Sequence, residues 1–279
     1  MTSTHDFELP GVLRDNALAW LSTPPPERTI APARLASTVM LLRESPSGAE
    51  VFVQRRVSSM KFAPSMWVFP GGGMDPRDEA RDVPWAGPSP QDWARLMGVP
   101  EPVAQALVIA AVREVFEECG VLLAGPSAET VVLDVAEPDW QADRAALLDR
   151  SLAFGELLQR RELRLRSDLL ALQDHWITPE MEPRRYDTWF FSALLPERQV
   201  ADAHTTEAEE AVWRRPADVL AQAQAGQARM FPPTRVQLER LAAWPDLAPV
   251  TVSRSGLTAV MPQPVRLGER VVLRTRLND

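Results

Sequence analysis

The sequence predicts a mixed fold of the α/β (α+β) class. Segments with strand-like alternation, such as residues 36–44 and 50–57, are mixed irregularly with segments of helical periodicity, such as residues 102–119. The 279 residues can bury a sizeable core, and the hydrophobic and charged shares of 45% and 24% are ordinary for a globular protein. We find neither internal repeats nor a low-complexity tract.

Charge and cysteine content limit the classes of partner and compartment. A formal net charge of −8 argues against broad electrostatic binding to nucleic acid or to an anionic membrane. The single cysteine, Cys119, excludes an internal disulfide and any multi-cysteine metal site. The N-terminus lacks a secretory pattern, and no run of 18 apolar residues predicts a membrane span. We therefore expect a cytoplasmic protein.

The first third of the chain contains a helix and three extended segments. Residues 10–21 have apolar positions at helical spacing and are followed by the proline-rich linker "STPPPER" at 22–28. The short "SPSG" connection makes residues 36–44 and 50–57 a hairpin. A third extended piece, "WVFPGGG" at 67–73, ends in a glycine turn.

A polar, proline-rich stretch, residues 76–101, reads as a surface excursion that holds one short helix. Ser89 is the expected N-cap of this helix, and Gly98 lies just past its end. Deletion of residues 80–99 is expected to leave metal binding intact and to alter the choice of substrate. The strongest helix follows from Pro102 to Cys119, with Gly120 as its stop.

The second half of the chain continues the mixture. The expected elements are a helical zone at 144–163, a buried strand at 187–195, a strand at 210–215, helices at 216–227 and 232–244, and short strands within 249–277. His175 is expected to lie in a turn and to have a structural hydrogen-bonding role.

The helix that ends at Cys119 carries an acidic face. At about 100° per residue, with Arg113 at zero, Glu117 falls near 40°, Glu114 near 100° and Glu118 near 140°. The opposite face is apolar and includes Val108, Val112, Val115, Phe116 and Cys119. One face therefore packs on a sheet, and the other presents three carboxylates.

Two interpretations of the acidic face are open. Like charges at these spacings cost a helix about 0.2–0.5 kcal/mol per pair, which a bound Mg²⁺ or Mn²⁺ would turn into attraction. Arg113, four residues before Glu117, can hold its carboxylate. The alternative is a solvated acidic helix face, because surface glutamates are common.

The segment "REVFEECGV" at 113–121 resembles the second half of the Nudix box, Gly-x5-Glu-x7-Arg-Glu-U-x-Glu-Glu-x-Gly-U, where U is aliphatic. The segment "FPGGG" with Asp75 resembles the first half. The five-residue spacing reaches Asp78 from Gly72 and Glu79 from Gly73, so the counterpart of the first glutamate is left open.

The distance between the two halves is too long for an uninterrupted box. From Gly72 to Arg113 the chain advances 41 positions where the box has 14, so about 27 residues are extra. This resembles the coenzyme A diphosphatase group of Nudix hydrolases, the nineteenth type, whose box is also split. The further similar stretches are "FAPSMWVFPGG" at 62–72, "HWITP" at 175–179, "RRYDTWFF" at 184–191 and "FPPTRVQLERL" at 231–241.

A second signature, which precedes the box in Nudix enzymes that cleave coenzyme A, matches in part. "FVQRRVSSMKFAPSMWVFPGG" aligns Arg56 and Lys61 with the two arginines of that signature. Ala63 and Ser65 stand where that signature has His and Gly. Arg56 and Lys61 are therefore either substrate-binding residues or ordinary surface residues.

The resemblance implies a Nudix fold, a mixed sheet between helices, and hydrolysis of a nucleoside diphosphate derivative. Coenzyme A or acyl-CoA is the leading substrate, NADH or ADP-ribose an alternative, and a non-catalytic nucleotide-binding domain a third. The implied catalytic residues are Arg113, Glu114 and Glu117; the implied ligands of Mg²⁺ or Mn²⁺ are Gly72, Glu114, Glu117 and Glu118. Substrate phosphate would meet Arg56, Lys61, Arg184 and Arg185. The general base is one of these glutamates or Glu207, Glu209 or Glu210.

The same resemblance divides the chain into three parts. Residues 1–30 are the N-terminal helix and linker, 31–245 the Nudix domain with its insertion at about 76–101, and 246–279 C-terminal strands packing on that domain. The expected partner is a small nucleotide, without nucleic acid or membrane, and the oligomeric state is left open, a homodimer included.

Overall fold

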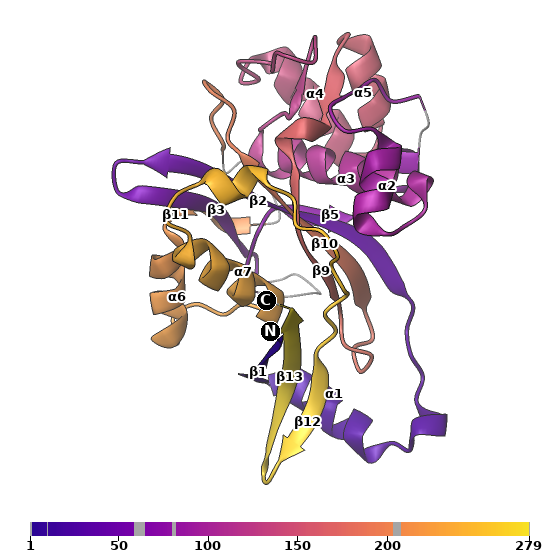
Figure 1. The fold of residues 1–279 in the computed structure, drawn as a ribbon, viewed down its shortest axis with the longest axis vertical. Coiled ribbons are helices and arrows are strands. Elements are labelled where there is room, and N and C mark those ends of the chain that lie inside the picture. Colours follow the sequence, from indigo (N-terminus) through magenta and orange to yellow (C-terminus); the bar gives the residue numbers. More distant parts are fainter. Residues whose placement is uncertain (1, 10, 59–64, 80–81, 203–207, 279) are drawn as a thin grey trace.

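The structure, a computed structural model, describes the whole chain except residues 1, 10, 59–64, 80–81, 203–207 and 279. Strands and helices are mixed irregularly along the chain, and the described strands form one sheet of seven strands and two sheets of three. Figure 1 shows the large sheet at the centre, with the terminal sheet below it.

The central sheet is mixed. Its order is β11-β3-β2-β10-β9, with β4 added to β3 and β5 added to β2. Its strands are β2 (Ala33–Ser45), β3 (Gly48–Arg56), β4 (Trp67–Val68), β5 (Gly71–Gly73), β9 (Ala171–Ile177), β10 (Arg185–Leu194) and β11 (Ala208–Arg214). β2 and β10 run parallel, and the other pairs run antiparallel. The predicted hairpin is confirmed, because Ser45 pairs with Gly48 across the turn.

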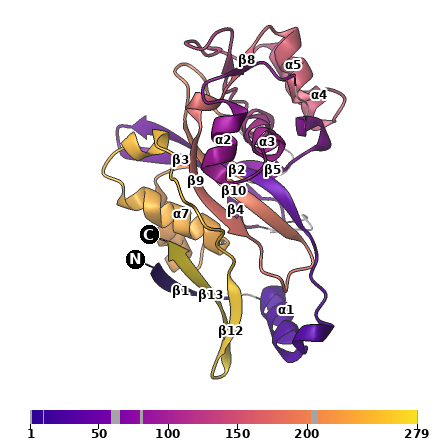
Figure 2. The same cartoon turned by 45° about the vertical axis from the view of Figure 1, so that its right-hand side comes forward.

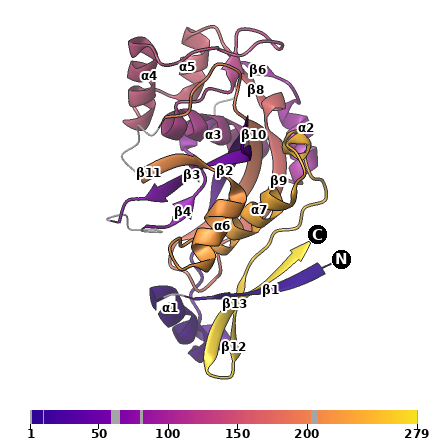
Figure 3. The ribbon, with the colours of Figure 1, turned by 90° about the vertical axis from the view of Figure 1, so that its left-hand side faces the viewer.

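Helices cover both faces of this sheet, as Figure 3 shows. Along β2, Val39 and Leu41 face α3 (Glu101–Cys119), whereas Met40 and Leu42 face α6 (Pro216–Gln224) and α7 (Pro232–Ala243). Alternate side chains of one strand therefore belong to two separate cores, as a strand buried on both faces requires. The predicted sheet between helices is confirmed.

The insertion between the halves of the box is built into the core. It contains a 3-10 turn, η2 (Pro76–Glu79), β6 (Trp85–Ala86) and α2 (Pro90–Met97). Ser89 caps α2 and Gly98 ends it in the left-handed region, as predicted. The prediction of a surface excursion was wrong, because Trp93 and Met97 are 2% and 6% exposed within the core beneath α3.

Four elements, α4 (Pro138–Leu148), α5 (Phe154–Arg160), β7 (Ala124–Gly125) and β8 (Arg164–Arg166), form a small cap over α3, next to the insertion (Figure 2). The predicted helical zone at 144–163 consists of α4 and α5. The third sheet, β6-β8-β7, joins β8 and β7 to the insertion. No periodicity revealed these strands, because each has only two or three residues.

The two ends of the chain meet in a separate sheet. β1 (Thr2–Glu8) pairs with β13 (Arg270–Asn278), which also pairs with β12 (Gln263–Leu267). The helix predicted at 10–21 is α1 (Gly11–Ser22), and its apolar side packs on β13. Strand β1 was not predicted. The N- and C-termini lie next to each other in all three ribbon views.

His175 lies in β9 and not in a turn. Its imidazole Nε2 is 2.5 Å from Asp187 Oδ1, and its ring stacks on Trp189 at 3.8 Å. The neighbouring Asp174 is buried and accepts hydrogen bonds from Gln237 and Arg240 of α7. The contacts of His175 therefore connect the segments 175–179 and 184–191, two of the stretches that resemble the coenzyme A diphosphatase group.

Within the described residues, no single helix is long and apolar enough to cross a membrane, although α2 and α3 together meet that length and composition across a 100° bend.

Candidate active site

Helix α3 presents its acidic face to the glycine turn. The helix begins after Pro100 and ends at Gly120, whose φ of 65° closes the last turn in the left-handed region. Glu114, Glu117 and Glu118 are only 7–8% exposed. The alternative of a solvated acidic helix face was therefore wrong.

The glycine turn touches these carboxylates directly. The Gly71 amide donates a hydrogen bond of 3.1 Å to Glu118 Oε2. At Gly72, an added Cβ would lie 2.5 Å from Glu114 Oε1, closer than any real contact. Strand pairing of Gly72 with Ser37 holds the turn in this position. A side chain at position 72 would therefore displace the Glu114 carboxylate where β5 meets α3.

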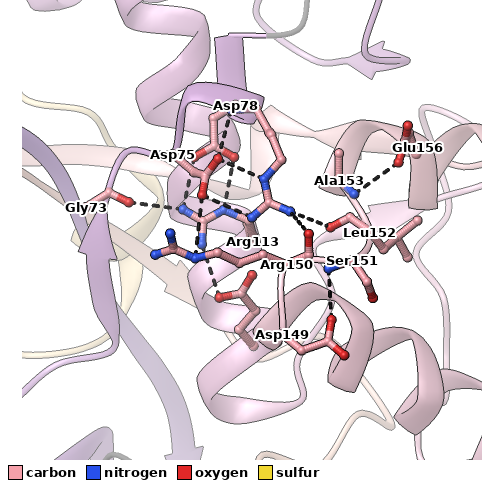
Figure 4. A network of polar contacts seen from close by, with 12 residues as sticks. Gly73, Asp75, Asp78, Arg113, Asp149, Arg150, Ser151, Leu152, Ala153 and Glu156 are labelled. Atoms are coloured by element: carbon pink, nitrogen blue, oxygen red, sulfur yellow. Dashed lines mark hydrogen bonds and ion pairs between the residues drawn. The ribbon is translucent and has the colours of Figure 1, made fainter.

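Arg113 lies at the centre of the cluster. Its contacts distinguish Asp78 from Glu79 as the counterpart of the first glutamate of the box. Its Nε and Nη2 donate to the two carboxylate oxygens of Asp78, both at 3.0 Å, and Nη1 donates to Glu114 at 2.8 Å and to Glu117 at 3.1 Å. Asp78 is buried, whereas Glu79 is exposed. Asp78 therefore stands opposite Arg113, as Figure 4 shows.

Burial and mutual repulsion disfavour the charged forms of these acids. Burial, together with the charge of Glu117, raises the pKa of Glu114 to about 7 against the lowering effect of Arg113. Burial likewise raises the pKa of Glu117 and of Asp78. Arg113 therefore offsets only part of the cost that burial imposes on the charged forms of these acids.

The donor set suits a divalent cation in its chemistry. Four carboxylates and glycine-turn carbonyls are hard oxygen ligands, and a bound cation would offset their repulsion. Across the described part of the chain, no three acidic, His or Cys side chains already converge at metal-binding distances. Glu114 and Glu117 instead share Nη1 of Arg113.

A second charged pair, which the sequence reading did not identify, supports the turn from outside. Arg77 donates from Nε and Nη2 to Asp75 and from Nη1 to the carbonyls of Arg150 and Leu152. These contacts tie η2 to the loop between α4 and α5. The pattern "DPRD" held a signal, since an arginine two residues after an aspartate can fold back on it.

The four expected phosphate-binding residues are in different situations. Arg56 ends β3, two residues after Gln54, whose amide is 4.0 Å from Cys119 Sγ; strand alternation therefore directs Arg56 to the α3 side. Lys61 lies outside the described residues, and Arg184 is exposed.

Arg185 is committed elsewhere. Its side chain is 9% exposed, and it donates to the carbonyls of Thr178 at 3.0 Å and of Ala31 at 2.8 Å. These contacts join the ends of β2, β9 and β10. They give Arg185 a structural role and do not support its expected contact with substrate phosphate.

The acids considered as alternative bases are only partly placed. Glu207 lies outside the described residues. Glu209 accepts a hydrogen bond of 2.9 Å from the Ser58 amide, and Arg55 lies 3.8 Å from Glu209 and 3.6 Å from Glu210. Both glutamates therefore have partners on β3 and the residues after it.

Comparison with known families and proteins agrees with this arrangement. Residues 89–241, more than half of the chain, match the family model described as the NUDT19 Nudix domain. This match includes α2 of the insertion and all of α3.

Two curated relatives are similar over most of the chain. A Caenorhabditis elegans protein described as nudix hydrolase 7 is 29% identical over 223 residues, which cover 80% of this chain and 66% of that protein. The acyl-coenzyme A diphosphatase NUDT19 of Gallus gallus is 27% identical over 247 residues, which cover 72% of this chain and 63% of that protein. The chain thus spans just under two thirds of the length of these relatives.

A solved structure shares the fold. The crystal structure of a Nudix hydrolase from Alicyclobacillus acidocaldarius superposes with a TM-score of 0.66 at 28% identity, covering 81% of this chain and 99% of that one. Together with the family match and the split box around Arg113, this similarity shows that the chain belongs to the Nudix hydrolases of the NUDT19 type.

Proposed function

We propose that the chain hydrolyses the diphosphate linkage of coenzyme A or acyl-CoA, giving adenosine 3′,5′-bisphosphate and 4′-phosphopantetheine or its acyl form. Water supplies the new P–O bond as the bridging P–O bond breaks, and the leaving phosphate takes up a proton. The observation that carries the proposal is the buried group of Glu114, Glu117 and Glu118, in which Glu114 lies against Gly72 and Glu118 accepts from the Gly71 amide.

Each side chain of the site has a proposed task. Glu114, Glu117 and Glu118, with the Gly72 carbonyl, would hold Mg²⁺ or Mn²⁺, which when bound neutralises diphosphate charge and lowers the pKa of water. Arg113, itself oriented by Asp78, holds Glu114 and Glu117 on one side of the cluster. Glu114 and Glu117 both accept from Nη1 of Arg113. Glu117 would give up this hydrogen bond on binding a cation, and Glu114 would keep it.

Phosphate recognition is proposed for three basic residues. Arg56, Lys61 and Arg184 are basic, and a guanidinium can bind a phosphate through two parallel hydrogen bonds. The choice of coenzyme A rests on the relative named acyl-coenzyme A diphosphatase and on the insertion within the box. Arg56 and Lys61 align with the arginines of the coenzyme A signature.

A substrate panel tests the proposal. The protein is incubated with Mg²⁺ or Mn²⁺ and coenzyme A, acetyl-CoA, NADH or ADP-ribose, and the products are identified by mass spectrometry. Adenosine 3′,5′-bisphosphate from coenzyme A is the expected result, and faster cleavage of NADH or ADP-ribose would reassign the substrate. No turnover of any compound, with nucleotide binding unchanged in Glu117→Gln, would identify a binding domain.

The matched control lies on the same helix. Glu101→Gln changes an exposed glutamate in the first turn of α3, far along the helix from the cluster. Glu117→Gln should abolish most turnover, whereas Glu101→Gln should keep it. Equal losses in both variants would mean that general damage to α3, and not loss of a ligand, explains the effect.

A further inference from the structure

The last turn of α3 is held by two residues that lie far outside the box. A helix leaves its last four carbonyls without helical partners. Here the Phe116 carbonyl accepts from the Gly120 amide at 3.0 Å, as in an ordinary glycine cap. The Glu117 carbonyl instead accepts from Arg144 Nε at 2.9 Å, and the Cys119 carbonyl from the Asp202 amide at 2.9 Å.

Arg144 and Asp202 are also bound to each other. Nη1 of Arg144 lies 2.9 Å and 2.7 Å from the two carboxylate oxygens of Asp202. Arg144, on α4, is only 2% exposed, whereas the Asp202 side chain is 27% exposed. A buried guanidinium is retained only where its donors are matched, so this geometry is strongly determined.

The pair closes tightly around the glycine that ends the helix. A Cβ on Gly120 would lie 2.7 Å from Asp202 Oδ2 and 2.9 Å from Arg144 Nη1. Gly120 is therefore needed for its φ of 65° and also for the close approach of this ion pair. The box glycine and the pair act as one unit.

We propose that Arg144 and Asp202 are positioning residues for the metal site, an inference that rests on the proposed function. The direction of a helical side chain follows its backbone, so a shift of the last turn displaces Glu117 and Glu118 together. The pair thereby sets the distance between these two carboxylates and the glycine turn.

Arg144→Lys tests this role because it keeps the charge but loses the planar fork. The matched control is Arg166→Lys, at the end of β8. Arg166 is likewise buried, with 7% exposed, and it donates to both oxygens of Asp168 and to the Thr130 carbonyl at 2.8 Å. Mn²⁺ binding is measured by electron paramagnetic resonance without substrate, and unfolding by urea. Both variants should lose stability, but only Arg144→Lys should weaken Mn²⁺ binding, by about tenfold or more.

The outcomes separate this proposal from the proposed function. Wild-type Mn²⁺ affinity in Arg144→Lys, or an equal loss in Arg166→Lys, overturns the positioning role alone. A wild-type protein that binds no Mn²⁺ overturns the metal-dependent function and this role with it. If Arg144→Lys does not fold, Mn²⁺ binding is measured in Asp202→Asn, whose partly exposed side chain keeps one oxygen acceptor. Wild-type Mn²⁺ affinity in that variant overturns the positioning role.

Discussion

Arg113 and Asp78 face each other through two parallel hydrogen bonds of 3.0 Å, although the insertion separates them by 35 positions. The insertion thus lengthens the box without opening the contact that orients its arginine. Both side chains are buried, and the remaining donor of Arg113 reaches Glu114 and Glu117. The acid at the start of the insertion and the carboxylates after it are therefore bound by one guanidinium.

Asp78→Asn should reduce both stability and turnover. Removing one partner of a buried ion pair costs about 3–5 kcal/mol, and Arg113 without its counter-charge would turn further onto Glu114 and Glu117. Urea unfolding and metal-dependent hydrolysis measure the two effects. Glu79→Gln, which changes the exposed neighbour, should leave both near wild type. Equal effects of the two substitutions would refute the assignment of Asp78.

Gly72→Ala should reduce turnover much more than stability. The new methyl group would lie 2.5 Å from Glu114 Oε1, so the carboxylate must move away from the turn. The neighbouring Gly73 is a close control, since a Cβ there would meet only the Leu35 carbonyl at 3.9 Å. Steady-state kinetics should show a loss of kcat in Gly72→Ala alone. Full activity of Gly72→Ala would mean that Glu114 needs no close contact with β5.

Trp93→Ala should destabilise the protein by about 3–5 kcal/mol, the usual cost of truncating a buried tryptophan. Trp93 is 2% exposed and its ring meets Phe191 of β10 edge to face at 5.8 Å. Arg95→Ala on the same helix, with a side chain 68% exposed, should change stability by about 0.5 kcal/mol or less. A cost for Trp93→Ala near that of the control would support the prediction of a surface excursion instead.

Asp168→Asn should remove a contribution to the free energy of unfolding that is present at neutral pH and lost at low pH. Hydrogen bonds from Arg166 lower the pKa of Asp168, so its folded pKa lies below the unfolded value of about 3.9. A lowered pKa stabilises the fold above the unfolded pKa, and this contribution disappears as pH falls through the folded pKa. Urea unfolding from pH 7 to 3 should therefore show a gap between wild type and variant that narrows below about pH 4.

The exposed Asp15 supplies the comparison for this measurement. Asp15→Asn should run parallel to wild type across the series. A gap between wild type and Asp168→Asn that stays constant down to pH 3 would mean that the charge of Asp168 does not contribute to folding.

The chemistry-bearing face of α3 could be predicted because it depends only on local geometry. Spacings of one, three and four residues place Glu114, Glu117 and Glu118 near each other on any helix, and Gly120 ends that helix by its own conformational freedom. The same holds for the Ser89 cap of α2 and for the hairpin after Ser45. These features need no information about distant parts of the chain.

The choice between neighbouring residues was decided only by tertiary packing. Asp78 points inward and Glu79 outward, and Arg185 is buried while Arg184 is exposed, because each backbone segment is oriented by the sheet and helix beside it. Spacing rules treat both members of such a pair alike.

The sequence by itself determined the acidic face, the glycine turn and their resemblance to a split Nudix box, since these follow from short-range periodicity and motif. Tertiary structure alone decided that Asp78 pairs with Arg113, that the insertion belongs to the core, and that Arg144 and Asp202 close the end of α3. The reason is physical: burial and ion pairing join residues tens of positions apart, and no local pattern encodes which of them meet.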